Sequence, residues 1–262
     1  AYTAIGRNKS SLFETKNTYL WQLKTGNPFA GTGRLNITSD HIDLFGEFKV
    51  SGAEQLNIKS TGDIRLNGST YVNDEFEGFK GELITTADMN LSARQVYAST
   101  LTDYKLTIAD NPEGKVTIAR PTDVKAEDNG APIMSVGSKI TVTAPQILQK
   151  GVLKAPGGEI VLQSGYLDSS DDEIVLIDDS KNDSASTIVL AENSITSVAL
   201  NDTYNLFGYV NNGLDWKYQN PYSKEPANDY LIDELPNKKI TIDAADVELQ
   251  QGSVVDISSS GD

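Results

Sequence analysis

Short runs of alternating aliphatic and polar residues recur along most of this chain. Three of them align without gaps over their first positions: 34–44, 139–149 and 239–249. Their aliphatic residues superimpose in three columns, which are Leu35 with Ile140 and Ile240, Ile37 with Val142 and Ile242, and Ile42 with Ile147 and Val247. Each run is short and rich in β-branched residues, and most end at Gly, Asn, Asp or Ser. The pattern therefore predicts β-strands with one buried face.

The spacing of these runs distinguishes between β architectures. Leu35, Leu56, Leu83 and Leu106 follow one another at intervals of 21, 27 and 23 residues. A sandwich of hairpins would show strands every ~8–12 residues without this longer period. A two-strand unit that recurs every twenty-odd residues indicates a solenoid with stacked coils. We predict an all-β fold, a right-handed parallel β-helix of about nine or ten coils, each adding ~4.8 Å of axial rise.

Polar residues alternate with the aliphatic ones in these strands. We expect them to face water and to stack on their equivalents in the neighbouring coils. The residues concerned are Asn36, Asn57, Thr107, Thr117, Thr141 and Thr241.

The repeat divides the chain into four parts. Residues 31–200 hold the coils, and residues 238–262 hold a final coil that we expect to continue beyond the last residue. Residues 1–30 contain five aromatic side chains and lack the repeat, which indicates a cap or the end of a preceding subdomain. Residues 201–237 interrupt the period as an aromatic-rich insertion.

The insertion is the main candidate for recognition. It holds seven of the twenty aromatic residues, and loops of this length on a compact fold are usually functional or disordered. One interpretation is a satellite core that folds the insertion onto the rod. A second is a ligand platform whose aromatic faces stack on sugar rings, and a third is a contact with a neighbouring domain. The candidate binding residues are Trp216, Tyr218 and Tyr222, with Tyr209 and Tyr230 beside them.

The amino-acid composition excludes several classes of ligand and of active site. The chain has 22 basic and 37 acidic residues, a formal charge of −15, which argues against binding to nucleic acid or to an anionic membrane. Cysteine is absent, and His41 is the single histidine, which we expect at the surface. These counts exclude cysteine-based sites and nearly exclude multi-histidine metal sites. We expect no enzyme activity, no cofactor and no metal, and no apolar run approaches a membrane span of ~20 residues.

Charged residues outside the insertion give weaker signals. The acidic clusters at 168–173, 178–183 and 127–129 lack a calcium-binding motif, so we interpret them as solvated loops. Arg65, Arg94 and Arg120 fall at different positions of the repeat, so we expect no anion-binding cradle.

Three stretches resemble a known family: residues 52–66, 81–97 and 242–258 are similar to filamentous-haemagglutinin-type exoproteins. The resemblance implies an interior β-helical shaft of a large passenger of two-partner secretion, displayed on a Gram-negative cell surface. It further implies that the parent protein has an outer-membrane secretion partner. It also implies contact with the surface of a host or neighbouring cell, for which a glycan is one candidate ligand. The secretion-domain motifs Asn-Pro-Asn-Leu and Asn-Pro-Asn-Gly-Ile are absent.

The sequence leaves three alternative functions open. The first is a non-catalytic structural and adhesive segment, an adhesin or toxin-delivery shaft that is secreted as a monomeric fibre segment. The second is a carbohydrate-binding module that uses residues 201–237. The third is a β-helical polysaccharide lyase or glycosidase, for which Asp171, Asp172, Asp178 and Asp179 are the available carboxylates.

Overall fold

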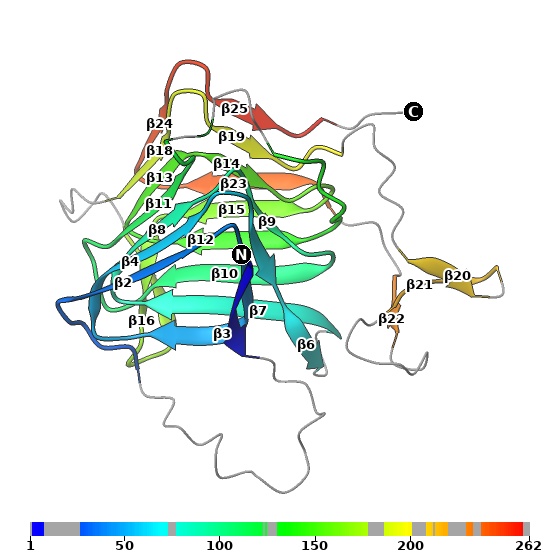
Figure 1. Ribbon diagram of the computed structural model, residues 1–262, viewed down its shortest axis with the longest axis horizontal. Coiled ribbons are helices and arrows are strands. Elements are labelled where there is room, and N and C mark those ends of the chain that lie inside the picture. The colour runs from blue at the N-terminus through cyan, green and yellow to red at the C-terminus, as the bar shows by residue number, and fades with distance from the viewer. Residues whose placement is uncertain are drawn as a thin grey trace, which may run out of the picture.

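The structure is a computed structural model that describes residues 2–7, 27–72, 77–122, 124, 130–177, 186–200, 208–211, 213–219, 229–232 and 237–258. These residues form strands and no helix, and most of the strands pair in parallel (Figure 1). The prediction of an all-β fold is thus confirmed. No helix that could cross a membrane occurs among the described residues.

Three long ladders of parallel strands make up the body of the molecule. The first ladder is the seven-stranded sheet of β2 (Gly33–Ser39), β4 (Ala53–Ser60), β8 (Asp88–Ser92), β11 (Lys115–Ala119), β13 (Gln146–Lys150), β18 (Thr187–Leu190) and β24 (Asp246–Leu249). The second ladder contains β1 (Tyr2–Arg7), the first half of β3 (His41–Val50), β5 (Ile64–Asn67), β9 (Val96–Ala98), β14 (Val152–Lys154), β19 (Ile195–Ser197) and β25 (Val254–Asp256). The third ladder contains the second half of β3, β7 (Glu77–Thr85), β10 (Thr102–Ile108), β12 (Lys139–Thr143), β15 (Glu159–Gln163) and β23 (Lys239–Asp243).

The chain visits the ladders in a fixed order. From β4 in the first ladder it passes to β5 in the second and β7 in the third, and it then returns to β8 beside β4. Because β3 pairs with both β5 and β7, the second and third ladders join into one strongly curled sheet. Neighbours in a ladder therefore come from successive repeats of the chain.

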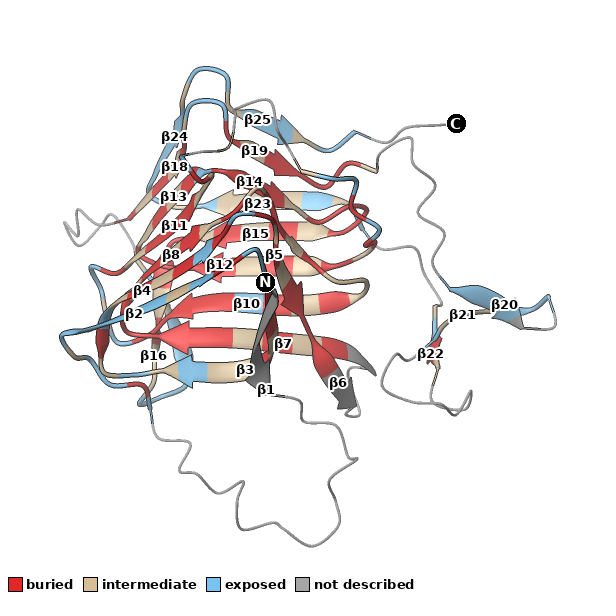
Figure 2. Cartoon of the chain, viewed as in Figure 1, coloured by how far each residue is buried: buried red, intermediate tan, exposed pale blue. Residues whose placement is uncertain are grey.

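Aliphatic side chains from the three ladders form one interior core. In the third ladder Ile140, Ile160 and Ile240 lie in register, as do Val142, Leu162 and Ile242. Figure 2 shows that the strands in the middle of each ladder are mostly buried, whereas β24 and β25 at the end are exposed. The core thus runs along the stack, and the last strands leave its end uncovered.

One part of the sequence alignment is wrong. Leu35 belongs to the first ladder, whereas Ile140 and Ile240 belong to the third. Likewise Ile42 lies in the second ladder, and Ile147 and Val247 lie in the first. The run at 34–44 therefore spans the first and second ladders, while the other two runs span the third and first.

The number of repeats is also lower than predicted. The first ladder has seven strands among the described residues, against the nine or ten coils expected. Runs such as 105–109 and 115–119 look like separate coils in the sequence, but they are two strands of one repeat in different ladders. At ~4.8 Å per step the first ladder extends over about 29 Å.

The fourth repeat skips the second ladder. The chain leaves β11 at residue 119 and reaches β12 at residue 139. None of the described residues between them forms a strand of the second ladder, and β9 pairs directly with β14. The returning chain crosses the end of β9, where the Ser135 hydroxyl donates to the Ala98 carbonyl and the Leu101 amide donates to the Val136 carbonyl. Residues 130–136, which border the second ladder through these bonds and a bond from Gln95 to the Ala131 carbonyl, are referred to as the excursion.

A hairpin covers part of the third ladder from outside. It consists of β16 (Gly165–Asp168) and β17 (Glu173–Leu176), and Leu167 packs with Ile84 and Ala109 in a second small core. Thr107, which lies in register with Ile84, is 2% exposed, so the prediction that it faces water is wrong. Asn36 and Asn57 do stack as expected, with a side-chain hydrogen bond of 2.9 Å.

The remaining strands are short. These are β6 (Ser69–Val72), which pairs with β7, and β20 (Tyr209–Asn211), β21 (Asp215–Tyr218) and β22 (Tyr230–Leu231), which form a separate antiparallel sheet. Within the segment expected to cap the rod, β1 adds a parallel strand to β3, and residues 8–26 lie outside the described part of the chain.

Two leucines that are direct neighbours in the first ladder test the core. Leu190 is fully buried and Leu249, its register partner in β24, is 61% exposed. We expect Leu190→Ala to lower the free energy of unfolding by about 3 kcal/mol and Leu249→Ala by less than about 1 kcal/mol. Urea unfolding followed by circular dichroism measures both, and equal losses would contradict the uncovered end.

A half-buried carboxylate on the third ladder, that of Glu82, gives a pH-dependent prediction. Burial raises the pKa of Glu82, although the Thr107 hydroxyl donates to its carboxylate at 3.1 Å. The folded state therefore binds the proton of the Glu82 carboxyl group more tightly than the unfolded state does. The contribution of Glu82 to the free energy of unfolding falls as the pH rises above about 4.5 and the carboxyl group loses this proton. We expect Glu82→Gln to gain stability over the parent chain between about pH 4 and about pH 7. Thermal unfolding at both pH values checks this, with the exposed Glu54→Gln as a control that should show no such gain.

Candidate functional site

The insertion builds the three-stranded antiparallel sheet of β20, β21 and β22. Trp216 lies opposite Val210, and Tyr218 lies opposite Tyr230. Directly opposed residues share a face and alternate residues return to it, so these four side chains lie on one face of the sheet. The other face carries Tyr209, Lys217 and Leu231, which are also in register.

The first of these faces contacts the body of the molecule. The ring of Phe79 in β7 lies edge to face with Tyr230 at a centroid distance of 4.7 Å and with Tyr218 at 6.0 Å. Phe79 and Tyr230 are both buried, at 3% and 4% exposure. This packing supports the satellite-core interpretation for Tyr218 and Tyr230, because both rings already pack against Phe79.

The other predicted binding residues lie apart from this contact. Trp216 is half-buried, with its indole nitrogen against Gly208, where an added Cβ would come within 2.7 Å of it. Tyr209 is exposed on the opposite face, and its hydroxyl donates to the Asp229 carboxylate, which raises the pKa of Tyr209. Tyr222 lies outside the described residues. The described candidates therefore do not share one surface.

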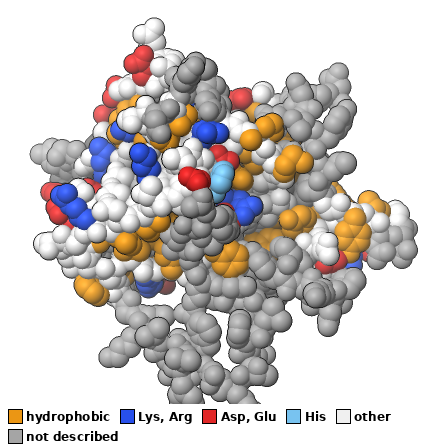
Figure 3. Space-filling view, in the orientation of Figure 1, with side chains coloured by type: hydrophobic (Ala, Val, Ile, Leu, Met, Phe, Trp, Pro, Cys, Tyr) orange, Lys and Arg blue, Asp and Glu red, His pale blue; other side chains and the backbone are white. Residues whose placement is uncertain are grey.

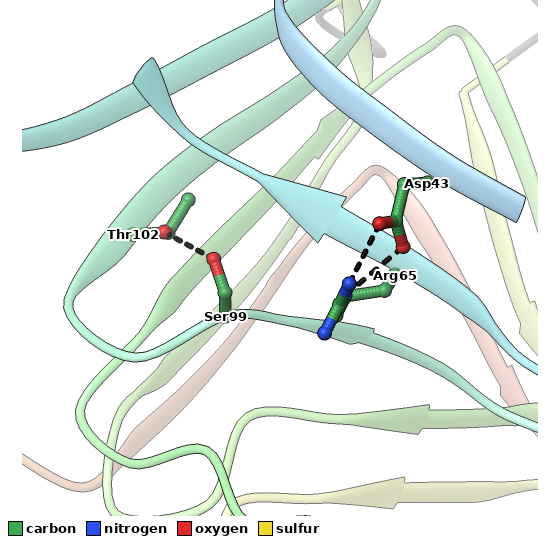
Figure 4. A network of polar contacts seen from close by, with 4 residues as sticks. All are labelled: Asp43, Arg65, Ser99 and Thr102. Atoms are coloured by element: carbon green, nitrogen blue, oxygen red, sulfur yellow. Dashed lines mark hydrogen bonds and ion pairs between the residues drawn. The ribbon is translucent and has the colours of Figure 1, made fainter. Parts of the chain in front are cut away.

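A second group of side chains forms a row on the outer face of the second ladder. Asp43, Arg65, Tyr97 and Lys154 are successive register partners in β3, β5, β9 and β14. The Arg65 guanidinium binds the Asp43 carboxylate through two hydrogen bonds, of 2.9 and 2.6 Å (Figure 4). Figure 4 also shows the Ser99 and Thr102 hydroxyls, which are 2.8 Å apart where the chain turns from β9 into β10.

Gln95 ties Lys154 of this row to a second carboxylate. The Lys154 ammonium donates to the Gln95 side-chain oxygen at 3.2 Å, and the Gln95 amide donates to Asp63 at 3.1 Å and to the carbonyl of Ala131 at 2.9 Å. Burial lowers the pKa of Lys154; the charge of Asp63 opposes this effect and that of Arg120 adds to it. The excursion therefore borders the row and fixes the orientation of Gln95.

Charges of both signs surround this row at the surface. His41 is exposed as predicted, and its Nδ1 accepts a weak 3.5 Å hydrogen bond from the Asp63 amide. Figure 3 shows the single histidine in pale blue with acidic and basic side chains beside it. The row is a mixed-charge surface within a chain of net charge −15.

This row is not evident from the sequence, for a specific reason. The three arginines Arg65, Arg94 and Arg120 fall at different positions of the repeat, and Arg94 and Arg120 lie outside the strands of the second ladder. The residue that completes the row is Lys154, which reaches Tyr97 only because the fourth repeat skips this ladder. A usable signal is the short apolar–polar–apolar pattern around each position, as in Ile42-Asp43-Leu44 and Ile64-Arg65-Leu66.

The described residues of the acidic segments do not form a comparable row of paired side chains. Asp171 and Asp172 are exposed in the turn between β16 and β17, and Asp178 and Asp179 lie outside the described residues, as do the clusters at 180–183 and 127–129. Hydrogen bonds from Ser170 lower the pKa of Asp168 in the same turn. The described part of the chain contains no group of three or more His, Cys, Asp or Glu side chains placed to hold a metal ion.

Comparison of this chain with protein-family models, curated proteins and solved structures found no match.

The contact with Phe79 can be tested directly. We expect Phe79→Ala to release the β20–β22 sheet, because Tyr218 and Tyr230 then lose their ring partner. Proteolytic cleavage within 201–237 should become about tenfold faster, since its rate follows the population of the open form. The matched variant Phe29→Ala removes an exposed ring, at 65% exposure, and should leave the cleavage rate unchanged. Equal cleavage in both variants would contradict the contact.

Proposed function

We propose that this chain is a right-handed parallel β-helix and serves as a rigid, non-catalytic segment of a secreted, surface-displayed adhesive protein. The observation that carries the proposal is the stacking of successive repeats in register along three ladders. A solenoid of this kind is stiff along its axis because each repeat packs on the next through a continuous core. Such stiffness suits a shaft that holds a contact region away from a cell.

The similarity of residues 52–66, 81–97 and 242–258 to filamentous-haemagglutinin-type exoproteins supports the same role. It is the basis for proposing a Gram-negative cell surface and an outer-membrane secretion partner. The acidic surface supports it further, because a net charge of −15 keeps rods of this kind soluble and apart.

A second candidate is glycan binding by the insertion. The observation in its favour is the outer face of the β20–β22 sheet, where the exposed Tyr209 and Leu231 flank Lys217. An aromatic ring beside a cation and an apolar side chain is a common surface for stacking and hydrogen bonding to a sugar. This candidate shifts the contact from Trp216 and Tyr218 to the opposite face.

A glycan array and a reducing-end assay test these proposals together. The shaft proposal expects no release of reducing ends from uronate polysaccharides, and release would overturn it in favour of a lyase or glycosidase. The second candidate expects glycan binding on the array to fall about tenfold in Tyr209→Ala, because this change removes one stacked ring. The exposed Leu214→Ala serves as control and should leave binding unchanged. Equal binding by both variants would remove the insertion as a glycan site.

A further inference from the structure

We propose that Arg65, Tyr97 and Lys154 form a binding site for a carboxylated sugar on the outer face of the second ladder. This proposal is independent of the adhesive role and of the insertion. The three residues occupy adjacent strands at one register position. Parallel strands are ~4.8 Å apart, so the backbones of Arg65 and Lys154 are separated by about 10 Å with Tyr97 between them. A sugar ring that lies over Tyr97 would reach both cations.

The two cations differ in how they are held. Arg65 is fixed by its paired hydrogen bonds to Asp43, yet 43% of its side chain remains exposed. Lys154 is half-buried and donates to the neutral amide oxygen of Gln95. A carboxylate beside Lys154 would stabilise a charge that its surroundings disfavour, as its lowered pKa indicates.

The neighbouring groups favour a sugar acid over a cluster of phosphate or sulfate groups. Asp43 and Asp63 lie beside the cations, and their charges repel phosphate or sulfate clusters. The half-buried Asp63 carboxylate would accept hydrogen bonds from sugar hydroxyls, and the half-buried Tyr97 ring would stack on a pyranose. A sugar ring with one carboxylate and several hydroxyl groups therefore matches the row best.

The site is already ordered in the free protein. Gln95 is 1% exposed and bonds to Lys154, Asp63 and the carbonyl of Ala131. The excursion that supplies this carbonyl is anchored again at Ala98 by Ser135. A ligand thus meets side chains whose rotamers are already restricted, which lowers the entropic cost of binding.

Calorimetric titration of the full chain with tri-galacturonate tests the proposal. We expect saturable binding, and binding of the methyl-esterified trimer about tenfold weaker, because the ester lacks the negative charges. Lys154→Gln should weaken binding about tenfold, Lys154→Arg should retain it, and Tyr97→Ala should weaken it by a similar factor. Lys59→Gln, an exposed lysine on the first ladder, makes the same charge change and should have no effect.

Several results would overturn the proposal. These are an absence of binding by the parent chain, equal binding of acid and ester, and equal effects of Lys154→Gln and Lys59→Gln. Inorganic sulfate that binds as tightly as the trimer would indicate an adventitious ion only, and would overturn the assignment to a sugar. Circular dichroism of each variant checks folding, and Lys154→Arg keeps the test decisive if Lys154→Gln fails to fold.

Discussion

The structure depends on parallel stacking of strands in strict register. Because side chains alternate along a strand, a shift of one residue would move every aliphatic side chain of that strand from the core to the surface. The register partners Ile140, Ile160 and Ile240 show the result, an apolar column that passes from one repeat to the next. The same constraint aligns the outer residues, so a row such as Arg65, Tyr97 and Lys154 is a consequence of the core. Core packing and surface chemistry thus have one origin.

The features that distinguish this molecule from a regular stack of strands lie where the chain departs from the repeat. The fourth repeat skips the second ladder, and this brings Lys154 beside Tyr97 and places the excursion along Gln95. The hairpin β16–β17 covers part of the third ladder, and the β20–β22 sheet packs on Phe79. Each departure is a segment longer than a turn that folds back onto a ladder, which agrees with the general finding that long connections carry function.

The sequence predicted the strands and their inward aliphatic residues, because alternation and turn residues are local properties. It could not assign each strand to a ladder. The runs around Leu35 and Ile140 look alike, yet they lie in different ladders, since all three ladders need the same apolar alternation. Nor could it show that Thr107 is covered or that Tyr218 and Tyr230 meet Phe79, because these contacts join segments far apart in the chain. Of the proposed sugar site, only the residue types were visible in advance.

Distances between spin labels along the first ladder test the central claim most directly. The chain has no cysteine, so pairs can be introduced without background at Asn36, Leu148 and Glu248, which occupy one outward register position. In-register stacking predicts backbone separations of about 19 Å for Asn36 to Leu148 and about 29 Å for Asn36 to Glu248, a constant ~4.8 Å per strand. Separations that do not grow in proportion to the number of intervening strands would contradict a single continuous stack.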